Sequence, residues 1–251
     1  MTDLSGKVAI VTGSARGIGR AIAVRYAALG ARVVINYFGN EEAAKQAVAD
    51  CQAVGKAEVI AVKADVSQVG EIERLFRTTL ERFGQVDIVV ANAGLELVDQ
   101  PAVEATEEQF DRLFGTNTKG AFFTLQKAAK YVSDGGRIIL IGSSSTASPV
   151  PGTGLYSASK AAARQLVRVL AVELIDRQVT VNTILPSPSA GAGVFTDLAD
   201  DAPEHEFFAR LRFGQRLGRP DDAADAAEYF AGDLAGYVSG QALLLSGGST
   251  F

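Results

Sequence analysis

The feature of this chain that most constrains its fold is a series of seven short apolar runs, separated by longer amphipathic segments. Most of the runs are continuously apolar instead of alternating with polar residues, which is typical of strands covered on both faces. They occupy residues 7–13, 31–37, 58–65, 86–94, 137–143, 179–185 and 241–248. Strands that alternate with helices form a parallel sheet with helices on both sides. The sequence therefore predicts an α/β fold built on a doubly wound parallel sheet of seven strands.

This series continues without a linker, charge block or internal repeat as far as residue 186, so we expect residues 1–251 to form a single domain. The irregular segment 186–220 is rich in Gly, Pro and Asp, and we interpret it as a substrate lid or loop. Its apolar side chains favour a hydrophobic pocket, although packing within a lid helix explains most of them equally well. They are Val194, Phe195, Leu198, Phe207, Phe208, Leu211 and Phe213.

Composition excludes several classes of function. The chain carries 24 Lys and Arg against 29 Asp and Glu, with the basic residues scattered, so nucleic acid is not an expected partner. One cysteine, Cys51, and one histidine, His205, are too few for a usual transition-metal site. No apolar run approaches the ~18 residues of a membrane span, and the first residues lack a signal-peptide pattern. We expect a cytoplasmic protein without a membrane partner.

A glycine-rich turn directly follows the first strand, in the stretch TGSARGIGRAIA. Gly13, Gly17 and Gly19 lie at G-x3-G-x-G spacing, and a helical pattern begins at once. Glycines let the backbone approach a pyrophosphate closely, and the helix N-terminus offers free N–H groups to the anion. A turn with packing roles alone would also be rich in glycine, but the position between strand and helix favours a Rossmann-type dinucleotide site.

The ends of the next three strands refine this site. NAD-specific sites carry an acidic residue at the end of the second strand, where this chain has Asn36 and Tyr37. Arg16, inside the glycine turn, can pair with a 2′-phosphate. We therefore expect NADP(H), with NAD(H) as the alternative if Arg16 is only a solvated turn residue. Asp65 and Asn92 end the third and fourth strands at the ligand edge, although each alone is more simply a cap or turn residue.

Tyr156 and Lys160 lie one helical turn apart in the stretch PGTGLYSASK. The spacing alone does not separate a proton-transfer pair from two surface residues of a helix. Ser143, at the end of the fifth strand and thirteen residues before Tyr156, and Asn117, within a long helical stretch, favour the proton-transfer pair.

With these motifs in place, the chain resembles the short-chain dehydrogenase/reductase family. The resemblance runs from GKVAIVTGSARGIGRAIA through DIVVANAG, NTKGAFF, IGSSS, YSASKAA and VNTILP to RLGRPDDAA and SGQALLLSGG. It is strongest for ketoacyl-carrier-protein reductases and polyhydroxynaphthalene-type ketone reductases, which are usually NADPH-dependent. It implies a catalytic tetrad of Asn117, Ser143, Tyr156 and Lys160.

The resemblance also implies the cofactor contacts and a homotetramer. The implied contacts are Gly13, Arg16, Gly17, Ile18, Gly19, Asn36, Tyr37, Asp65, Val66, Asn92, Ala93, Gly94, Tyr156, Lys160 and Pro186. In the tetramer, helices 107–132 and 155–177 would pack against those of a neighbour. The small residues Ala158, Ala161, Ala162 and Ala163 would permit close approach of helices, although they would do the same inside a monomer.

The chemistry that the resemblance implies suits these residue types. Hydride transfer to a ketone forms an alkoxide, which needs a proton and a hydrogen-bond donor. Tyr156 would be the general acid, and Lys160 would favour its phenolate, because an unperturbed tyrosine has a pKa near ~10. Ser143 would polarise the carbonyl, and Asn117 would position a water that relays protons from Lys160.

The chain departs from the family pattern in two places. After the sixth strand Ser187 replaces a usual glycine, and Gly191 falls near an expected threonine that holds the nicotinamide, so Ser189 or the backbone has to substitute for it. The turn before the fifth strand carries Asp134 instead of the basic residues that favour an acidic carrier protein. Arg177 is a possible carrier contact or an ordinary helix-end cation.

We therefore expect a reductase of a small hydrophobic ketone. One alternative is a 3-oxoacyl-carrier-protein reductase. A second is a dinucleotide-binding sensor that has lost its chemistry, which the four intact tetrad residues disfavour. An epimerase or dehydratase is disfavoured by the short chain, since those relatives usually add a substrate domain.

Overall fold

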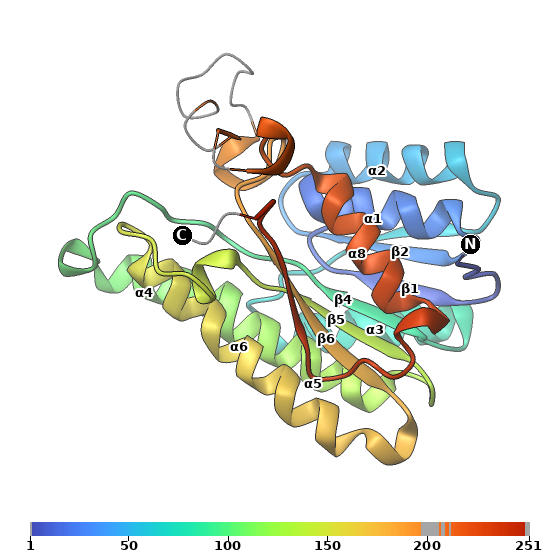
Figure 1. Ribbon diagram of the computed structural model, residues 1–251. Coiled ribbons are helices and arrows are strands. Elements are labelled where there is room, and N and C mark those ends of the chain that lie inside the picture. The colour runs from blue at the N-terminus through green and yellow to red at the C-terminus, as the bar shows by residue number, and fades with distance from the viewer. Residues whose placement is uncertain (1, 197–205, 207–208, 211, 249–251) are drawn as a thin grey trace.

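The computed structural model describes residues 2–196, 206, 209–210 and 212–248 (Figure 1). Its centre is a sheet of seven parallel strands in the order β3-β2-β1-β4-β5-β6-β7. The strands are β1 (Val8–Val11), β2 (Arg32–Tyr37), β3 (Val59–Lys63), β4 (Ile88–Ala91), β5 (Arg137–Ile141), β6 (Thr180–Pro186) and β7 (Ala242–Leu245). Each strand falls within one of the apolar runs, except that β6 extends one residue beyond its run to Pro186. The predicted doubly wound sheet is confirmed.

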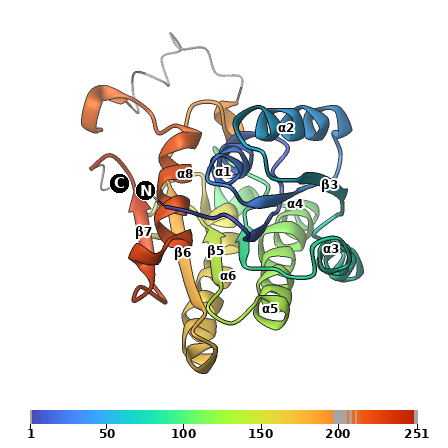
Figure 2. The ribbon, with the colours of Figure 1, turned by 90° about the vertical axis from the view of Figure 1, so that its right-hand side faces the viewer.

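Helices cover both faces of the sheet (Figure 2). One face carries α1 (Gly17–Ala28), α2 (Glu41–Val54) and α8 (Pro220–Ala231). The other carries α3 (Val69–Phe83), α5 (Ala121–Tyr131) and α6 (Gly154–Glu173), with α4 (Glu107–Leu113) leading towards α5. This three-layer arrangement buries β1, β2, β4, β5 and β6 between two layers of helix, whereas the edge strand β7 is largely exposed.

The residues of β1 show why the sequences of the predicted strands are continuously apolar. Val8 and Ile10 pack into the core under α3, α5 and α6, whereas Ala9 and Val11 pack into the core under α1, α2 and α8. All four side chains are fully buried. Because successive side chains of a strand point to opposite faces, a strand buried on both faces has no position for a polar residue.

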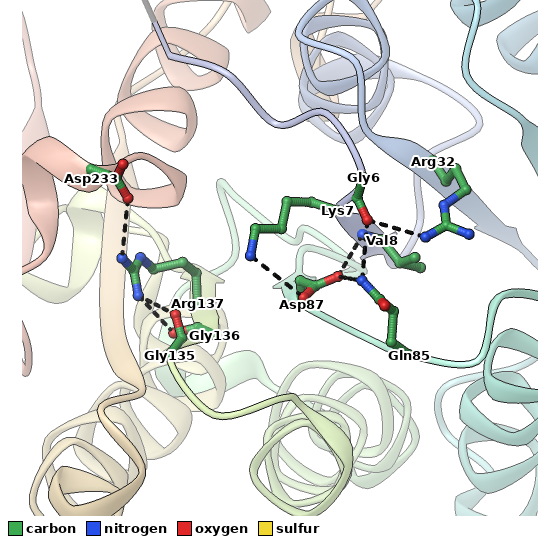
Figure 3. Close-up of polar contacts among 10 residues, drawn as sticks. All are labelled: Gly6, Lys7, Val8, Arg32, Gln85, Asp87, Gly135, Gly136, Arg137 and Asp233. Carbon is green, nitrogen blue, oxygen red and sulfur yellow. Dashed lines mark hydrogen bonds and ion pairs between the residues drawn. The ribbon is translucent and has the colours of Figure 1, made fainter.

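Asp87 ties the amino ends of the two central strands together (Figure 3). Its carboxylate accepts hydrogen bonds from the backbone N–H of Val8 at 2.8 Å and from the Gln85 amide at 2.7 Å. Lys7 forms an ion pair with it at 3.7 Å. The residue is 6% exposed, so these partners supply the interactions that water would otherwise provide.

Two predicted helices differ in detail from the structure. The predicted helix 107–132 is present, but its middle, Phe114–Gly120, is π-helical and joins α4 to α5 without a break. The predicted helix 155–177 is too long, because α6 ends at Glu173 and a separate 3-10 turn follows at Ile175–Arg177. The chain then reverses at Gln178, which adopts a φ of 54°.

Candidate active site

A cleft of about 1920 Å³ lies at the carboxyl ends of the strands. The strand order runs outward in both directions from β1 and β4, so the chain crosses from one half of the sheet to the other between these strands. In open α/β sheets, ligands bind at this switch point. All fifteen of the predicted cofactor contacts border the cleft. Ser143, Val150, Pro151 and Thr153 border it as well.

The glycine turn borders this cleft and requires its glycines. Gly13 and Gly17 have φ values of 61° and 55°, a region that L side chains rarely adopt. A Cβ on Gly13 would lie 2.8 Å from the Cα of Ala93, and one on Gly19 would lie 2.5 Å from the Asn92 amide nitrogen. No side chain caps the N-terminus of α1, and the first turn of this helix carries no acidic residue. Its N–H groups are therefore free to bind an anion.

Asn92 holds the turn against β4. Its side-chain amide donates to the carbonyls of Thr12 at 2.8 Å and Gly13 at 3.1 Å. In return, the Thr12 hydroxyl accepts from the backbone N–H groups of Asn92 and Ala93. Asn92 thus borders the cleft while its polar atoms bind the protein itself, and Thr12 is a part of this site that the sequence reasoning missed.

The side chain of Asn36 binds backbone groups of the protein, so it is not available to a ligand at the end of β2. Its side chain is 1% exposed, accepts from the N–H of Gly13 at 3.1 Å, and donates to the carbonyls of Val62 and Ala64. Of the two residues predicted to stand in place of an acid, Asn36 closes the glycine turn, and the half-buried Tyr37 is the one left to face a ligand. The exposed Arg16 borders the same end of the cleft.

Asp65 combines a turn with a place in the cleft. One of its carboxylate oxygens accepts from the backbone N–H of Ser67 at 2.9 Å, and its own N–H donates to Glu71. These two hydrogen bonds are those of a turn-forming residue, which is one of the two roles expected for Asp65. The side chain still borders the cleft together with Val66.

Ser143, Tyr156 and Lys160 meet at the other end of the cleft. Ser143 follows β5, is 8% exposed, and lies 2.9 Å from the hydroxyl of Ser145. Lys160 is also 8% exposed, and its ammonium donates to the carbonyl of Ile141 at 3.4 Å. A Cβ on Gly94 would come within 2.7 Å of this ammonium, so the glycine at 94 leaves the space that the lysine occupies.

Burial sets the protonation of the pair. Desolvation lowers the pKa of Lys160 to about 8, and the charge of Glu96 acts in the opposite direction. Desolvation raises the pKa of Tyr156, Glu96 raises it further, and a hydrogen bond with Ser143 lowers it. At neutral pH the tyrosine therefore holds its proton, and the lysine is a cation close to its point of titration.

Asn117 lies behind the cleft, in the π-helical segment, and is 1% exposed. Its side chain accepts from the N–H of Leu95 at 2.8 Å, and donates to the Leu95 carbonyl at 2.8 Å and to the Ser159 hydroxyl at 2.9 Å. The amide is thus bound to the protein, and it fixes the loop that follows β4. Ser159 was missed by the sequence reasoning, although it directly precedes Lys160 in the motif.

Comparisons with known proteins identify the family of the chain. The chain matches the model of the family described as enoyl-(acyl carrier protein) reductase over residues 13–250.

The chain belongs to the short-chain dehydrogenase/reductase family.

Similar members of the short-chain dehydrogenase/reductase family are known both as sequences and as structures. A hydroxynaphthalene reductase-like protein, Arp2, from Metarhizium majus is 40% identical and is matched over 98% of this chain and 96% of that protein. The promiscuous reductase LugOII, described as catalysing keto-reduction in lugdunomycin biosynthesis, superposes with a TM-score of 0.91 at 36% identity over all of both chains. A short-chain dehydrogenase from Burkholderia cenocepacia J2315, solved in complex with NADP, gives 0.89 at 33% identity over 98% of both chains.

In this short-chain dehydrogenase/reductase the end of the cleft beside Tyr156 has both apolar and acidic side chains, the acidic ones being Glu96 and Asp99. The apolar residues that border it are Leu95, Val98, Val150, Pro151, Val194, Phe195 and Leu244. Of the predicted apolar residues of segment 186–220, Leu198, Phe207, Phe208 and Leu211 lie outside the described residues, as does His205. Phe213 is described and is 88% exposed.

The segment after β6 shows how the departure from the family pattern is accommodated. Ser187 donates its N–H to the carbonyl of Leu245, and the Ser189 hydroxyl donates to the Ser187 carbonyl at 2.9 Å. Ser187 and Ser189 border the cleft, whereas Gly191 is exposed with a φ of 74°. The Ser189 hydroxyl proton is thus already used within the segment.

Two further properties concern the described part of the chain. It contains no group of three or more His, Cys, Asp or Glu side chains that could hold a metal ion. No helix in the described ranges is long and apolar enough to cross a membrane.

Proposed function

We propose that the protein is an NADPH-dependent carbonyl reductase that converts a small hydrophobic ketone to a secondary alcohol. The observation that carries the proposal is that one cleft joins the glycine turn at its one end to Ser143, Tyr156 and Lys160 at its other end. In this proposal residues 1–251 act as a single domain, and segment 186–220 forms the substrate loop.

The residues of the cleft fit a nicotinamide dinucleotide. Gly13 and Gly19 lie so close to Ala93 and Asn92 that neither position admits a side chain, which fixes the shape of the turn. The free N–H groups of α1 suit a pyrophosphate. Arg16 and Tyr37 would hold the 2′-phosphate of the adenosine ribose, and Lys160 the nicotinamide ribose. When bound, the dinucleotide supplies the hydride. NADP is the ligand of one solved relative, which supports this preference over NAD.

Tyr156 would then donate its proton to the ketone oxygen as negative charge develops there. Its raised pKa keeps that proton in place at neutral pH, and the Ser143 hydroxyl would donate a second hydrogen bond to the same oxygen. The nearby ammonium of Lys160 would stabilise the phenolate that forms and return a proton to it from solvent. Asn117 would support this relay by fixing the loop at Leu95, because its own amide is already bound.

The direct test is the oxidation of NADPH, followed by its absorbance, with a panel of cyclic and aryl ketones. We expect the wild type to reduce at least one of them. Tyr156→Phe should bind NADPH with unchanged affinity and lose about 10²-fold or more in kcat, since it removes the general acid alone. Retained turnover in Tyr156→Phe would contradict the assignment.

Cofactor preference is tested by the affinities for NADPH and NADH in the wild type and in Arg16→Ala. Loss of one ion pair with the 2′-phosphate should lower NADPH affinity about tenfold and leave NADH affinity unchanged. Equal affinities of the wild type for both cofactors would remove the proposed preference.

A reductase of carrier-bound ketoacyl thioesters is the second candidate, and the position of Arg177 bears on it. Its guanidinium pairs with Asp134 at 2.7 Å and also donates to the carbonyls of Ala129 and Val132. It therefore fastens the chain near the start of β5, at the edge of the sheet away from the cleft, and is not available to a carrier at the cleft mouth. Steady-state kinetics with an acetoacetyl carrier-protein thioester and with 1-tetralone decide between the two, and a preference for the thioester would favour the second candidate.

A sensor that binds the dinucleotide without turning it over is the remaining alternative. Tight NADPH binding with no oxidation by any ketone of the panel would favour it over the reductase.

A further inference from the structure

Glu96 joins two walls of the cleft that are far apart in the sequence. It lies in the loop after β4 and borders the substrate side. Its carboxylate accepts a hydrogen bond from the backbone N–H of Val194 at 2.9 Å. Val194 belongs to the 3-10 turn Gly193–Phe195, which follows β6 and borders the same side of the cleft. An acidic side chain thus holds the turn that begins the substrate loop.

Gly193 makes this contact possible. It has a φ of 58°, and a Cβ built on it would come within 2.1 Å of the same Glu96 oxygen. No side chain larger than hydrogen fits there while the carboxylate keeps its place. The close approach therefore depends on the residue types at both positions, 96 and 193.

The same carboxylate also acts on the reacting groups. Glu96 is the acidic residue whose charge raises the pKa of both Tyr156 and Lys160, so its negative charge is felt where the ketone would bind. Asp99 adds a second acidic side chain to this wall. A side chain of the opposite charge, Arg212, also borders the cleft, beside the Ser187–Ser189 segment. A carboxylate on a substrate near Tyr156 would lie close to the negative charge of Glu96, and like charges repel each other.

We propose that Glu96 is a specificity-determining residue, which holds the Gly193–Phe195 turn at the substrate side of the cleft and selects uncharged ketones against ketones that carry a carboxylate. This inference rests on the proposed reductase function. It narrows the substrate class of the same site from hydrophobic ketones to neutral ones.

A matched pair of ketones tests the charge selection. Methyl 4-acetylbenzoate and 4-acetylbenzoate present the same aryl ketone with and without a negative charge. We expect the wild type to reduce the ester with a kcat/KM at least about tenfold above that of the acid. Glu96→Gln keeps an oxygen that can accept from Val194 and removes the charge, so the ratio of the two kcat/KM values should fall about tenfold.

Hydrogen exchange tests the hold on the turn, and it needs neither cofactor nor substrate. The Val194 amide should exchange at least about tenfold faster in Glu96→Ala than in the wild type, and Glu96→Gln should restore most of the protection. Gly193→Ala should also increase exchange. Gly191→Ala is its matched control, because Gly191 has a similar φ of 74° but no atom within 4 Å of its built Cβ.

The outcomes of these experiments distinguish a failure of the Glu96 proposal from a failure of the proposed reductase function. A wild type that reduces neither ketone nor any other of the panel contradicts the reductase function, and the charge selection falls with it. A wild type that reduces ester and acid equally well, or a ratio that Glu96→Gln leaves unchanged, contradicts the selection alone. Unchanged exchange at Val194 in Glu96→Ala contradicts the hold on the turn.

Discussion

Lys160 shows how closely a single residue of this site depends on the backbone around it. Its ammonium is enclosed by the carbonyl of Ile141 and the space that Gly94 leaves open. Enclosure removes water from the charge and brings its pKa down to about 8, within reach of ordinary assay conditions. In the proposed mechanism, the state of this one proton decides whether a cation is available to stabilise the Tyr156 phenolate.

Reductase activity should follow the titration of Lys160. Below its pKa the lysine is charged, and above it the charge is lost, so kcat/KM for the ketone should fall as the pH rises through about 8. Initial rates over about pH 6 to 10 give the profile. In Lys160→Arg the charge persists throughout, since an arginine pKa lies above ~12, and the falling limb should disappear even if the maximal rate is lower. A limb that stays in place in this variant would assign it to another group.

At the scale of secondary structure, a cluster of charges joins α3 to α5. Glu73 on α3 forms an ion pair with Lys127 on α5 at 3.0 Å and a second with Arg77 at 3.0 Å, and it accepts a hydrogen bond from the Tyr131 hydroxyl. The Tyr131 hydrogen bond is the largest of the influences that lower the pKa of Glu73 to about 2, followed by the contact with Lys127. The ionised carboxylate thus stabilises the packing of the two helices.

Replacement of Glu73 by glutamine should destabilise the protein in a pH-dependent way. The pKa of Glu73 is lowered in the folded chain from its ordinary 4.5, so its contribution is fully present above about 4.5 and is lost as the pH falls through about 2. The thermal unfolding midpoint of Glu73→Gln should therefore lie below that of the wild type at pH 7, and the difference should shrink as the pH approaches 2. Glu81→Gln, on an exposed position of the same helix, is the control, and an equal drop in both variants would contradict the prediction.

The elements that sequence predicted best are those fixed by local pattern. Strands buried on both faces leave an unbroken apolar run. All seven strands were found from such runs, including the edge strand β7, whose apolar residues are largely exposed in the structure. The end of α6 was placed too late, because Leu174 is apolar and buried and Gln178 takes a positive φ without being glycine. The π-helical turn around Asn117 was not expected either, since its apolar spacing resembles that of a regular helix.

The residues of the site also fall into two groups, those that a local motif predicts and those whose role depends on contacts distant in the sequence. Gly13, Tyr156 and Lys160 belong to compact motifs, and the structure brings all three into one cleft. The bonds of Asn36 go to Gly13 and to the chain after β3, and those of Glu96 go to a turn 98 residues away. Such roles depend on which segments become neighbours in space, and no local pattern records that.

At the scale of the whole molecule, we propose that the chain forms a homotetramer through the outer face of α6. Ala158, Ala161 and Ala162 lie on that face, but Ala163 belongs to the core, at 2% exposed. Val169 and Val172 are 41% and 67% exposed there, so they present apolar surface next to the alanines. Partner helices would cover them.

Val172→Asp should therefore reduce the assembly from tetramer to dimer, because a charge at the centre of an apolar contact is expensive to bury. Size-exclusion chromatography with light scattering gives the mass, relative to 26.3 kDa for one chain. Val54→Asp is the control, since Val54 is 49% exposed at the end of α2 on the other face of the sheet. A monomeric wild type would contradict the proposed tetramer.

Removal of the Asp87 carboxylate should affect stability and spare activity. Asp87→Ala leaves the buried N–H of Val8 without its side-chain partner, which should lower the free energy of unfolding by about 1–3 kcal/mol. Urea denaturation measures this loss. The kcat of the folded variant should equal that of the wild type, because these contacts lie at the opposite edge of the sheet from the cleft. A reduced kcat at unchanged stability would show that the two edges are coupled.

The position of the Asp87 contacts also has a consequence for how a chain like this can change over evolutionary time. The two central strands are fastened to each other at their amino ends, whereas the ketone would meet, besides Tyr156 on α6, the loops at the carboxyl ends, such as those at Glu96, Val150 and Val194. Substitutions in those loops can therefore accumulate without weakening the anchorage of the sheet. A lineage of such chains can adopt new ketones one loop at a time while its scaffold and its proton donor stay as they are.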